Sequence, residues 1–163
     1  MVNVGIDHDT AAFAAARIGR WWDQMGQERY PEAHHLDITA DGGGSNGWRN
    51  RLWKIEPQAL ANRTGLTIHV SHFPPGTSKG NKIEHRLFSV ISMNWRGRVF
   101  RTIETLVQCI GNTRTTKGLT VQAELATTAY PTGQAVDPNG LAHLYGVPEN
   151  FHGEWNDVIA PQQ

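Results

Sequence analysis

Two carboxylates, Asp41 and Glu84, are the side chains of this sequence whose positions best suit chemistry. Asp41 follows the alternating run 36–40 and precedes three glycines, a pattern by which a strand presents a side chain at the edge of a sheet. Glu84 follows the second apolar run, 66–72, and falls in the first turn of a predicted helix. Such hard oxygen ligands suit Mg²⁺ or Mn²⁺ better than zinc. The structural alternative is that Asp41 closes a turn and that Glu84 complements the helix dipole.

Three other sites in the same stretch fit less well. Residues 42–47 match the dinucleotide pattern G-x-G-x-x-G, but Asp41 would then lie beside a pyrophosphate, and no acid ends the next strand. Trp48 stands where a P-loop requires lysine. His69 and His72 are an odd number of residues apart on one strand, so they point to opposite faces and cannot share a zinc ion.

The elements that must position the two acids alternate between strands and helices. The predicted strands are 2–6, 36–40, 66–72 and 119–125, and the predicted helices are 10–26, one ending near Arg63, one opened by Asn81 and one containing 103–110. The first strand, the first helix and the second strand form a βαβ unit, so strands 2–6, 36–40 and 66–72 are predicted to be neighbours in one sheet. We therefore expect an α/β fold in a single domain, residues 1–163, whose tail from about 127 to 163 is rich in turns.

The charge distribution and the cysteine content bear on the ligands and the cellular compartment expected for the protein. The net charge is zero, but residues 1–117 hold all 15 Lys and Arg with 10 acids, whereas residues 118–163 hold 5 acids and no Lys or Arg. A basic body suits a polyanion, although an ordinary solvated surface explains it equally well. Cys109 is the only cysteine, which excludes an intrachain disulfide and favours a reducing compartment. With no signal peptide and no membrane-spanning run, a soluble cytoplasmic protein is expected.

Several motifs, taken in order, resemble the DDE-type transposases of bacterial insertion sequences. They are Asp-Gly-Gly-Gly-Ser-Asn at 41–46, Phe-Pro-Pro-Gly-Thr-Ser-Lys at 73–79, Asn-Lys-Ile-Glu-His-Arg-Leu-Phe-Ser at 81–89 and Asn-Trp-Arg-Gly at 94–97. The similar branch is named after a Rhodopirellula transposase and is related to the mariner-like enzymes. The resemblance extends from residues 4–10 to residues 151–156, and Gly80 and Pro57 are small departures from the family pattern.

The resemblance implies a ribonuclease H-like fold, with a mixed sheet flanked by helices, in which two aspartates and a glutamate hold two divalent metals. Asp41 corresponds to the second aspartate and Glu84 to the glutamate, so both are expected to be catalytic metal ligands for Mg²⁺ or Mn²⁺. The first aspartate would lie on a strand before residue 1. The fold is therefore expected to be N-terminally truncated, with its first strands absent, and the chain to be an inactive C-terminal part of a domain that cuts and joins DNA. The alternatives are a non-catalytic module for oligomerisation or DNA binding, and a ribonuclease H-like nuclease.

The same resemblance assigns supporting roles around the two acids. Asn81 and His85 are expected to surround the metal ligands. Lys79, Lys82 and Arg86 are expected to contact the phosphates of DNA at the transposon ends.

The missing first strand leaves two possible repairs. The strand at 2–6 can shift inward to pair with 36–40, which would bring Asp7 beside Asp41 as a further metal-ligand candidate. Alternatively, a second copy of the chain supplies a strand in a homodimer. The inward shift is the preferred expectation, because the helix at 10–26 is long enough to make the crossover.

Overall fold

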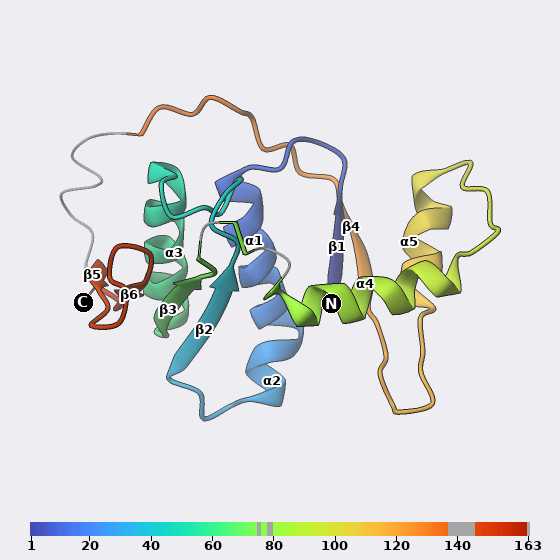
Figure 1. The fold of residues 1–163 in the computed structure, drawn as a ribbon, viewed down its shortest axis with the longest axis horizontal. Helices are drawn as coiled ribbons and strands as arrows, with labels where there is room; N and C mark the ends of the chain where they lie inside the picture. The colour runs from blue at the N-terminus through green and yellow to red at the C-terminus, as the bar shows by residue number, and fades with distance from the viewer. Residues whose placement is uncertain (75, 78–79, 137–145, 163) are drawn as a thin grey trace. The chain divides into compact units, whose positions relative to one another are not determined.

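A computed structural model of the chain describes residues 1–74, 76–77, 80–136 and 146–162 (Figure 1). It forms two compact units. One comprises Asp9–Gly80 and Tyr130–Gln163 and is called the Asp41 unit below. The other comprises Met1–His8 and Asn81–Ala129 and is called the Glu84 unit. Both contain strands and helices, so the α/β class is confirmed.

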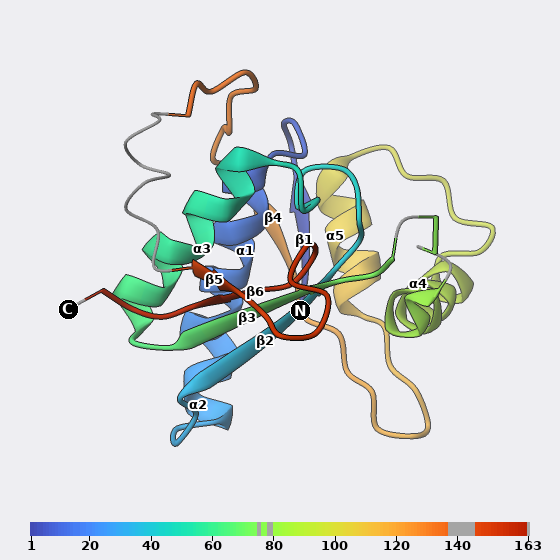
Figure 2. The ribbon, with the colours of Figure 1, turned by 60° about the vertical axis from the view of Figure 1, so that its left-hand side comes forward.

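The Asp41 unit is built on a four-stranded sheet. Its strands, in spatial order, are β2 (His35–Ala40), β3 (Thr67–His72), β6 (Asp157–Ile159) and β5 (Gly146–Pro148). β2 and β3 are parallel, with Leu36 opposite Ile68, and β6 runs antiparallel to both of its neighbours. Figure 2 shows this sheet with α1 and α3 on one side of it. The prediction that 36–40 and 66–72 are neighbours is confirmed.

Helices cover the apolar face of this sheet. They are α1 (Ala11–Trp21), which continues through a π-helical turn η1 (Trp22–Gly26) into α2 (Gln27–Arg29), and α3 (Arg51–Thr64). The core joins alternate residues of β3 and β6 to small and apolar residues of α1 and α3, and its members are Ala11, Ala15, Trp53, Leu60, Ala61, Ile68, Val70 and Ile159. Ile68 has no solvent exposure. Side chains along β2 and β3 therefore alternate between a buried and a more exposed face of the sheet, as the sequence pattern predicts.

The opposite face of β2 and β3 is polar. Burial alternates along β3, so His72 lies on the core face and His69 on the polar face. His69 Nδ1 lies 2.9 Å from Glu149 Oε1, and His69 Nε2 lies 3.2 Å from His35 Nδ1. Because His69 uses both ring nitrogens in these contacts, neither is left for a metal ion.

The Glu84 unit has its own sheet and core. β1 (Val2–Gly5) pairs in parallel with β4 (Ala123–Ala126), beside α4 (Lys82–Asn94) and α5 (Ile103–Gly111). The buried centre is Ile91, Ile110 and Val121, with Val2, Val4, Leu87, Trp95, Leu106 and Ala123 packed around it. Cys109 is buried on α5.

The prediction that strand 2–6 pairs with 36–40 is wrong, because β1 and β2 belong to different sheets. β4 provides the partner instead, since the Val2 N–H donates to the Gln122 carbonyl at 2.7 Å and Val2 packs on the apolar cluster of the Glu84 unit. The predicted inward shift of strand 2–6 is therefore wrong too. Without that pairing, the argument that placed Asp7 beside Asp41 no longer holds. The homodimer alternative stays a prediction. Among the described residues, no helix is long and apolar enough to span a membrane.

Candidate metal and nucleic-acid site

Asp41 lies immediately after the last residue of β2, and one of its carboxylate oxygens is among four buried side-chain atoms that have no hydrogen-bond partner within the described residues. The Asp41 Oδ1 atom is buried, and none of the described residues forms a hydrogen bond with it. An unsatisfied buried acceptor costs about 1–3 kcal/mol, and more when it is charged, so it requires an explanation. A bound divalent cation would supply the missing partner, and the Asp41 carboxylate is a ligand of the kind that Mg²⁺ and Mn²⁺ prefer. The local structure at Asp41 thus fits a metal ion.

The glycine loop after Asp41 is held in one conformation by hydrogen bonds. Ser45 Oγ donates to Asp9 Oδ1 at 2.9 Å, and Asn50 Nδ2 donates to the Ser45 carbonyl at 2.7 Å. A Cβ atom at Gly47 would lie 2.9 Å from the backbone of Gly43, so the loop folds back on itself closely enough to require glycine there. Asp41 is therefore followed by a fixed turn.

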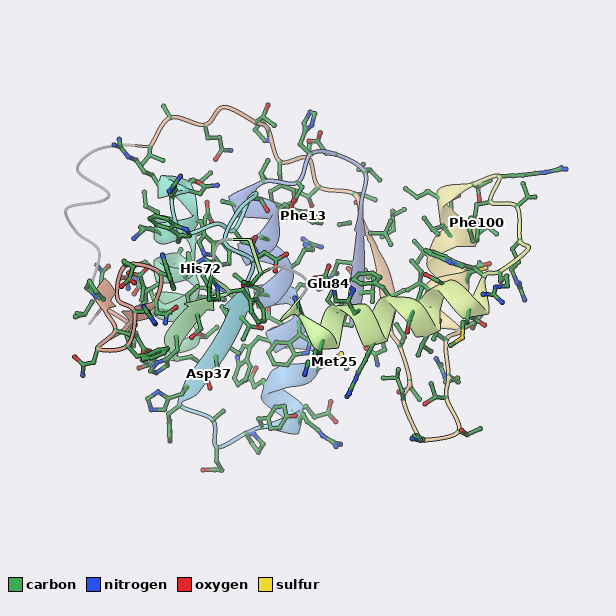
Figure 3. All side chains as sticks on the ribbon, viewed as in Figure 1. Phe13, Met25, Asp37, His72, Glu84 and Phe100 are labelled. Atoms are coloured by element: carbon green, nitrogen blue, oxygen red, sulfur yellow. The ribbon has the colours of Figure 1, made fainter. Side chains whose placement is uncertain are left out.

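His72 joins this loop to the C-terminal segment. It is 7% exposed, at the end of β3, and its Nε2 lies 2.8 Å from the Asn46 carbonyl. Its Nδ1 contacts the Trp155 carbonyl, and its backbone N–H donates to Asn156 Oδ1 at 3.0 Å. Figure 3 labels His72 on β3. From the sequence, His72 was considered only as a zinc candidate. The signal that was missed is a polar residue at a buried strand position, which must form hydrogen bonds.

Asn50 caps α3 at the end of the loop. Its Oδ1 accepts from Leu52 N at 3.1 Å and from Trp53 N at 3.3 Å. Asn50→Ala is expected to destabilise the protein by about 1 kcal/mol, because two N–H groups lose their acceptor. The thermal midpoint should fall by about 2–4 °C. Asn50→Asp keeps the cap and loses only the bond to Ser45, so it should lie closer to the wild type. If the Asn50→Ala variant and the wild type had the same thermal midpoint, the capping role of Asn50 would be contradicted.

Glu84 is held by the residue that begins its helix. Asn81 is the N-cap of α4: its Oδ1 accepts from Glu84 N at 3.2 Å, and its Nδ2 donates to Glu84 Oε2 at 3.0 Å. This reciprocal pair resembles a capping box and fixes the direction of the carboxylate. Glu84 is exposed in the first turn of α4, as Figure 3 shows.

The remaining predicted residues fall into three groups. Lys82, His85 and Arg86 have exposed side chains on α4. Asp7 follows β1, and its Oδ1 lies 3.4 Å from His8 Nε2. Lys79 lies outside the described residues.

The two acids belong to different units, so a metal site shared by Asp41 and Glu84 stays a prediction. Across the described parts of the chain, no three or more His, Cys, Asp or Glu side chains gather to hold a metal ion. The two acids are therefore described separately. Asp41 has a buried carboxylate oxygen, and Glu84 accepts a hydrogen bond from Asn81.

A cavity of about 400 Å³ lies between α1 and α3 in the Asp41 unit, and Asp41 is not among the residues that line it. Two pairs of its polar groups contact one another: Arg63 Nη1 lies 2.7 Å from Asp23 Oδ1, and Arg17 Nη2 donates to the Tyr130 hydroxyl at 3.0 Å. Burial raises the pKa of Glu56, which lines the same cavity. This arrangement resembles a packed helix interface more than a reactive site.

Residues 1–161 match the family model described as Rhodopirellula transposase DDE domain. The match covers nearly the whole chain and includes Asp41, Glu84 and the motifs between them. No curated protein and no solved structure matches the chain.

Proposed function

Because this chain belongs to the Rhodopirellula transposase DDE domain family, we propose that it is part of a transposase catalytic domain that cuts and joins DNA with divalent metal ions. The observation that carries this proposal is the buried Asp41 Oδ1 without a hydrogen-bond partner. The order of elements supports a ribonuclease H-like arrangement, since parallel β2 and β3 are linked through α3 and the next helix begins beside Glu84.

In this proposal, Asp41 and Glu84 hold Mg²⁺ or Mn²⁺. The bound ions would activate water or a DNA 3′-hydroxyl and stabilise the leaving oxygen. Asn50 holds the loop that follows Asp41 through the Ser45 carbonyl, and Asn81 restrains the Glu84 carboxylate by donating to its Oε2. The exposed cations Lys82 and Arg86 contact DNA phosphates near Glu84.

The second candidate is a non-catalytic module that binds DNA or another copy of the chain. The number of metal-binding acids favours this second candidate. The family site uses three carboxylates, and the resemblance assigns only two of them to residues 1–163. Both candidates share metal binding at Asp41 but differ in whether these residues alone perform chemistry.

The test compares two aspartates of the same strand region. Asp41→Asn is expected to weaken Mn²⁺ binding by about tenfold or more, the range seen when even supporting groups of a metal site are lost. Asp37→Asn, on the exposed face of β2, should bind Mn²⁺ within about twofold of the wild type, because surface changes away from a site have small effects. Isothermal titration and the electron paramagnetic resonance of Mn²⁺ measure both.

Thermal unfolding without metal separates a ligand from a turn-closing residue. Asp41→Asn should not lower the midpoint, because it removes a buried charge that has no hydrogen-bond partner at Oδ1. A clear loss of stability together with unchanged Mn²⁺ affinity would show that Asp41 is structural and would overturn the proposal.

A further inference from the structure

A cavity of about 340 Å³ opens in the loop that follows Asp41. It is lined by Gly42, Gly43, Gly44, Gly47, Trp48, Arg49 and Asn50. Small-molecule sites usually occupy about 300–1,000 Å³, so this cavity is large enough for one nucleotide and too small for a duplex. The hydrogen bonds of Ser45 and Asn50 fix the loop, so the cavity is formed before any ligand arrives.

The glycines keep this cavity open. A Cβ atom at Gly43 would meet no atom within 4 Å, so the missing side chain leaves free space at the cavity wall. Gly43 is not among the glycines with positive φ, whereas Gly44 has a φ of 79°. A larger residue at Gly43 would therefore narrow the cavity without straining the backbone, which provides a clean way to block it.

Trp48 and Arg49 lie against one another at the wall of the same cavity. The Arg49 guanidinium carbon lies 4.5 Å from the centroid of the Trp48 ring, within cation–π distance. Arg49 is exposed, and none of the carboxylates in the described ranges forms an ion pair with it. Indole rings and guanidinium planes are surfaces on which nucleic-acid bases stack, and a free guanidinium also binds phosphate.

We infer that this loop pocket receives one unpaired nucleotide of DNA, next to the phosphodiester held at Asp41. Its base stacks on the Trp48–Arg49 pair, and Arg49 contacts its phosphate. The inference rests on the proposed function, because the Asp41 carboxylate alone repels phosphate and a divalent ion there removes that repulsion. An unpaired nucleotide is required, since a base inside a duplex has both faces covered by its neighbours.

The test measures binding of fluorescein-labelled single-stranded hexathymidylate by anisotropy, with and without Mn²⁺, at about 50 mM salt, where phosphate contacts are strong. The wild type should bind much more tightly with Mn²⁺. Trp48→Ala, Arg49→Gln and Gly43→Leu should each weaken binding by about five- to tenfold, the effect expected for one stacked base or one blocked pocket. Trp48→Phe should restore binding, because it keeps an aromatic face. Mn²⁺ affinity should stay unchanged in the Trp48 and Arg49 variants, and Gly43→Leu is compared with the wild type at saturating Mn²⁺.

Arg51→Gln is the matched control, because Arg51 is exposed, lies two residues from Arg49 and does not line the cavity. If Arg51→Gln weakens binding as much as Arg49→Gln, or if Gly43→Leu and Trp48→Ala bind like the wild type, the pocket inference is wrong while Mn²⁺ binding still supports the proposed function. If the wild type binds no Mn²⁺, the proposed function is wrong and the pocket inference falls with it.

Discussion

His72→Ala is expected to lower the free energy of unfolding of the Asp41 unit by about 2–4 kcal/mol. The substitution removes the imidazole that contacts the Asn46 and Trp155 carbonyls, and the carbonyl that accepts its N–H is left unsatisfied at a cost of about 1–3 kcal/mol. It also leaves a cavity at a site that is 7% exposed. Urea unfolding measures the loss, and hydrogen exchange of residues 42–50 and 146–162 locates it.

Two controls separate an anchor from ordinary core packing. Ile68→Ala removes a side chain with no exposure from the same strand and should cost a similar amount, about 2–5 kcal/mol. Because Ile68 pairs with Ile159, this variant should also affect β6, but it should not selectively speed hydrogen exchange in the loop at 42–50, whereas His72→Ala should. Ser71→Ala, on the exposed face of β3, should change stability by less than about 0.5 kcal/mol. Equal exchange patterns for His72→Ala and Ile68→Ala would show that His72 only fills space.

The pairing of β2 with β3 was predictable, whereas the partner of β1 was not. Alternating residues from 36 to 40 and from 66 to 72, joined by one helix, favour a parallel pair with a buried face. The run at 2–6 has the same local pattern, but alternation does not say which strand it joins. Its partner, β4, begins at Ala123 and is brought to it through the packing of Ile91, Ile110 and Val121. Long-range packing of that kind leaves no signal in a local pattern.

The elements that carry the two acids were predictable from the sequence, whereas the contacts around each acid were not. The strand-end position of Asp41 and the first-turn position of Glu84 follow from the pattern of the sequence. The buried Oδ1 of Asp41 and the role of His72 depend on residues 46 and 155–156, which are distant in the sequence. The chain crosses between the units after His8, Gly80 and Ala129, and the motifs of the family resemblance on either side of Gly80 gave no sign of a boundary.

Residues 1–163 by themselves are expected to leave DNA uncut and unjoined in Mg²⁺ or Mn²⁺. Two carboxylates leave at least one ion of a two-metal site under-coordinated, and within the described residues no set of three ligands is gathered. Because catalysed reactions are typically accelerated by about 10⁶-fold or more, an incomplete site should show as an absence of detectable product. Plasmid nicking and oligonucleotide joining assays measure this.

Glu84→Gln and Glu104→Gln give the decisive comparison, since both glutamates are exposed in the first turn of a helix of the same unit. Neither substitution should change the background in the DNA assays, because no cleavage is expected from the wild type. Metal-dependent cleavage that is abolished by Glu84→Gln and retained by Glu104→Gln would contradict the prediction. It would mean that another acid of these residues completes the site, and Asp7→Asn would then identify whether that acid is the one after β1. We expect the wild type and both variants to be inactive on DNA, and only Glu84→Gln to bind Mn²⁺ more weakly. That result would fit Glu84 as one ligand of a site that residues 1–163 do not complete.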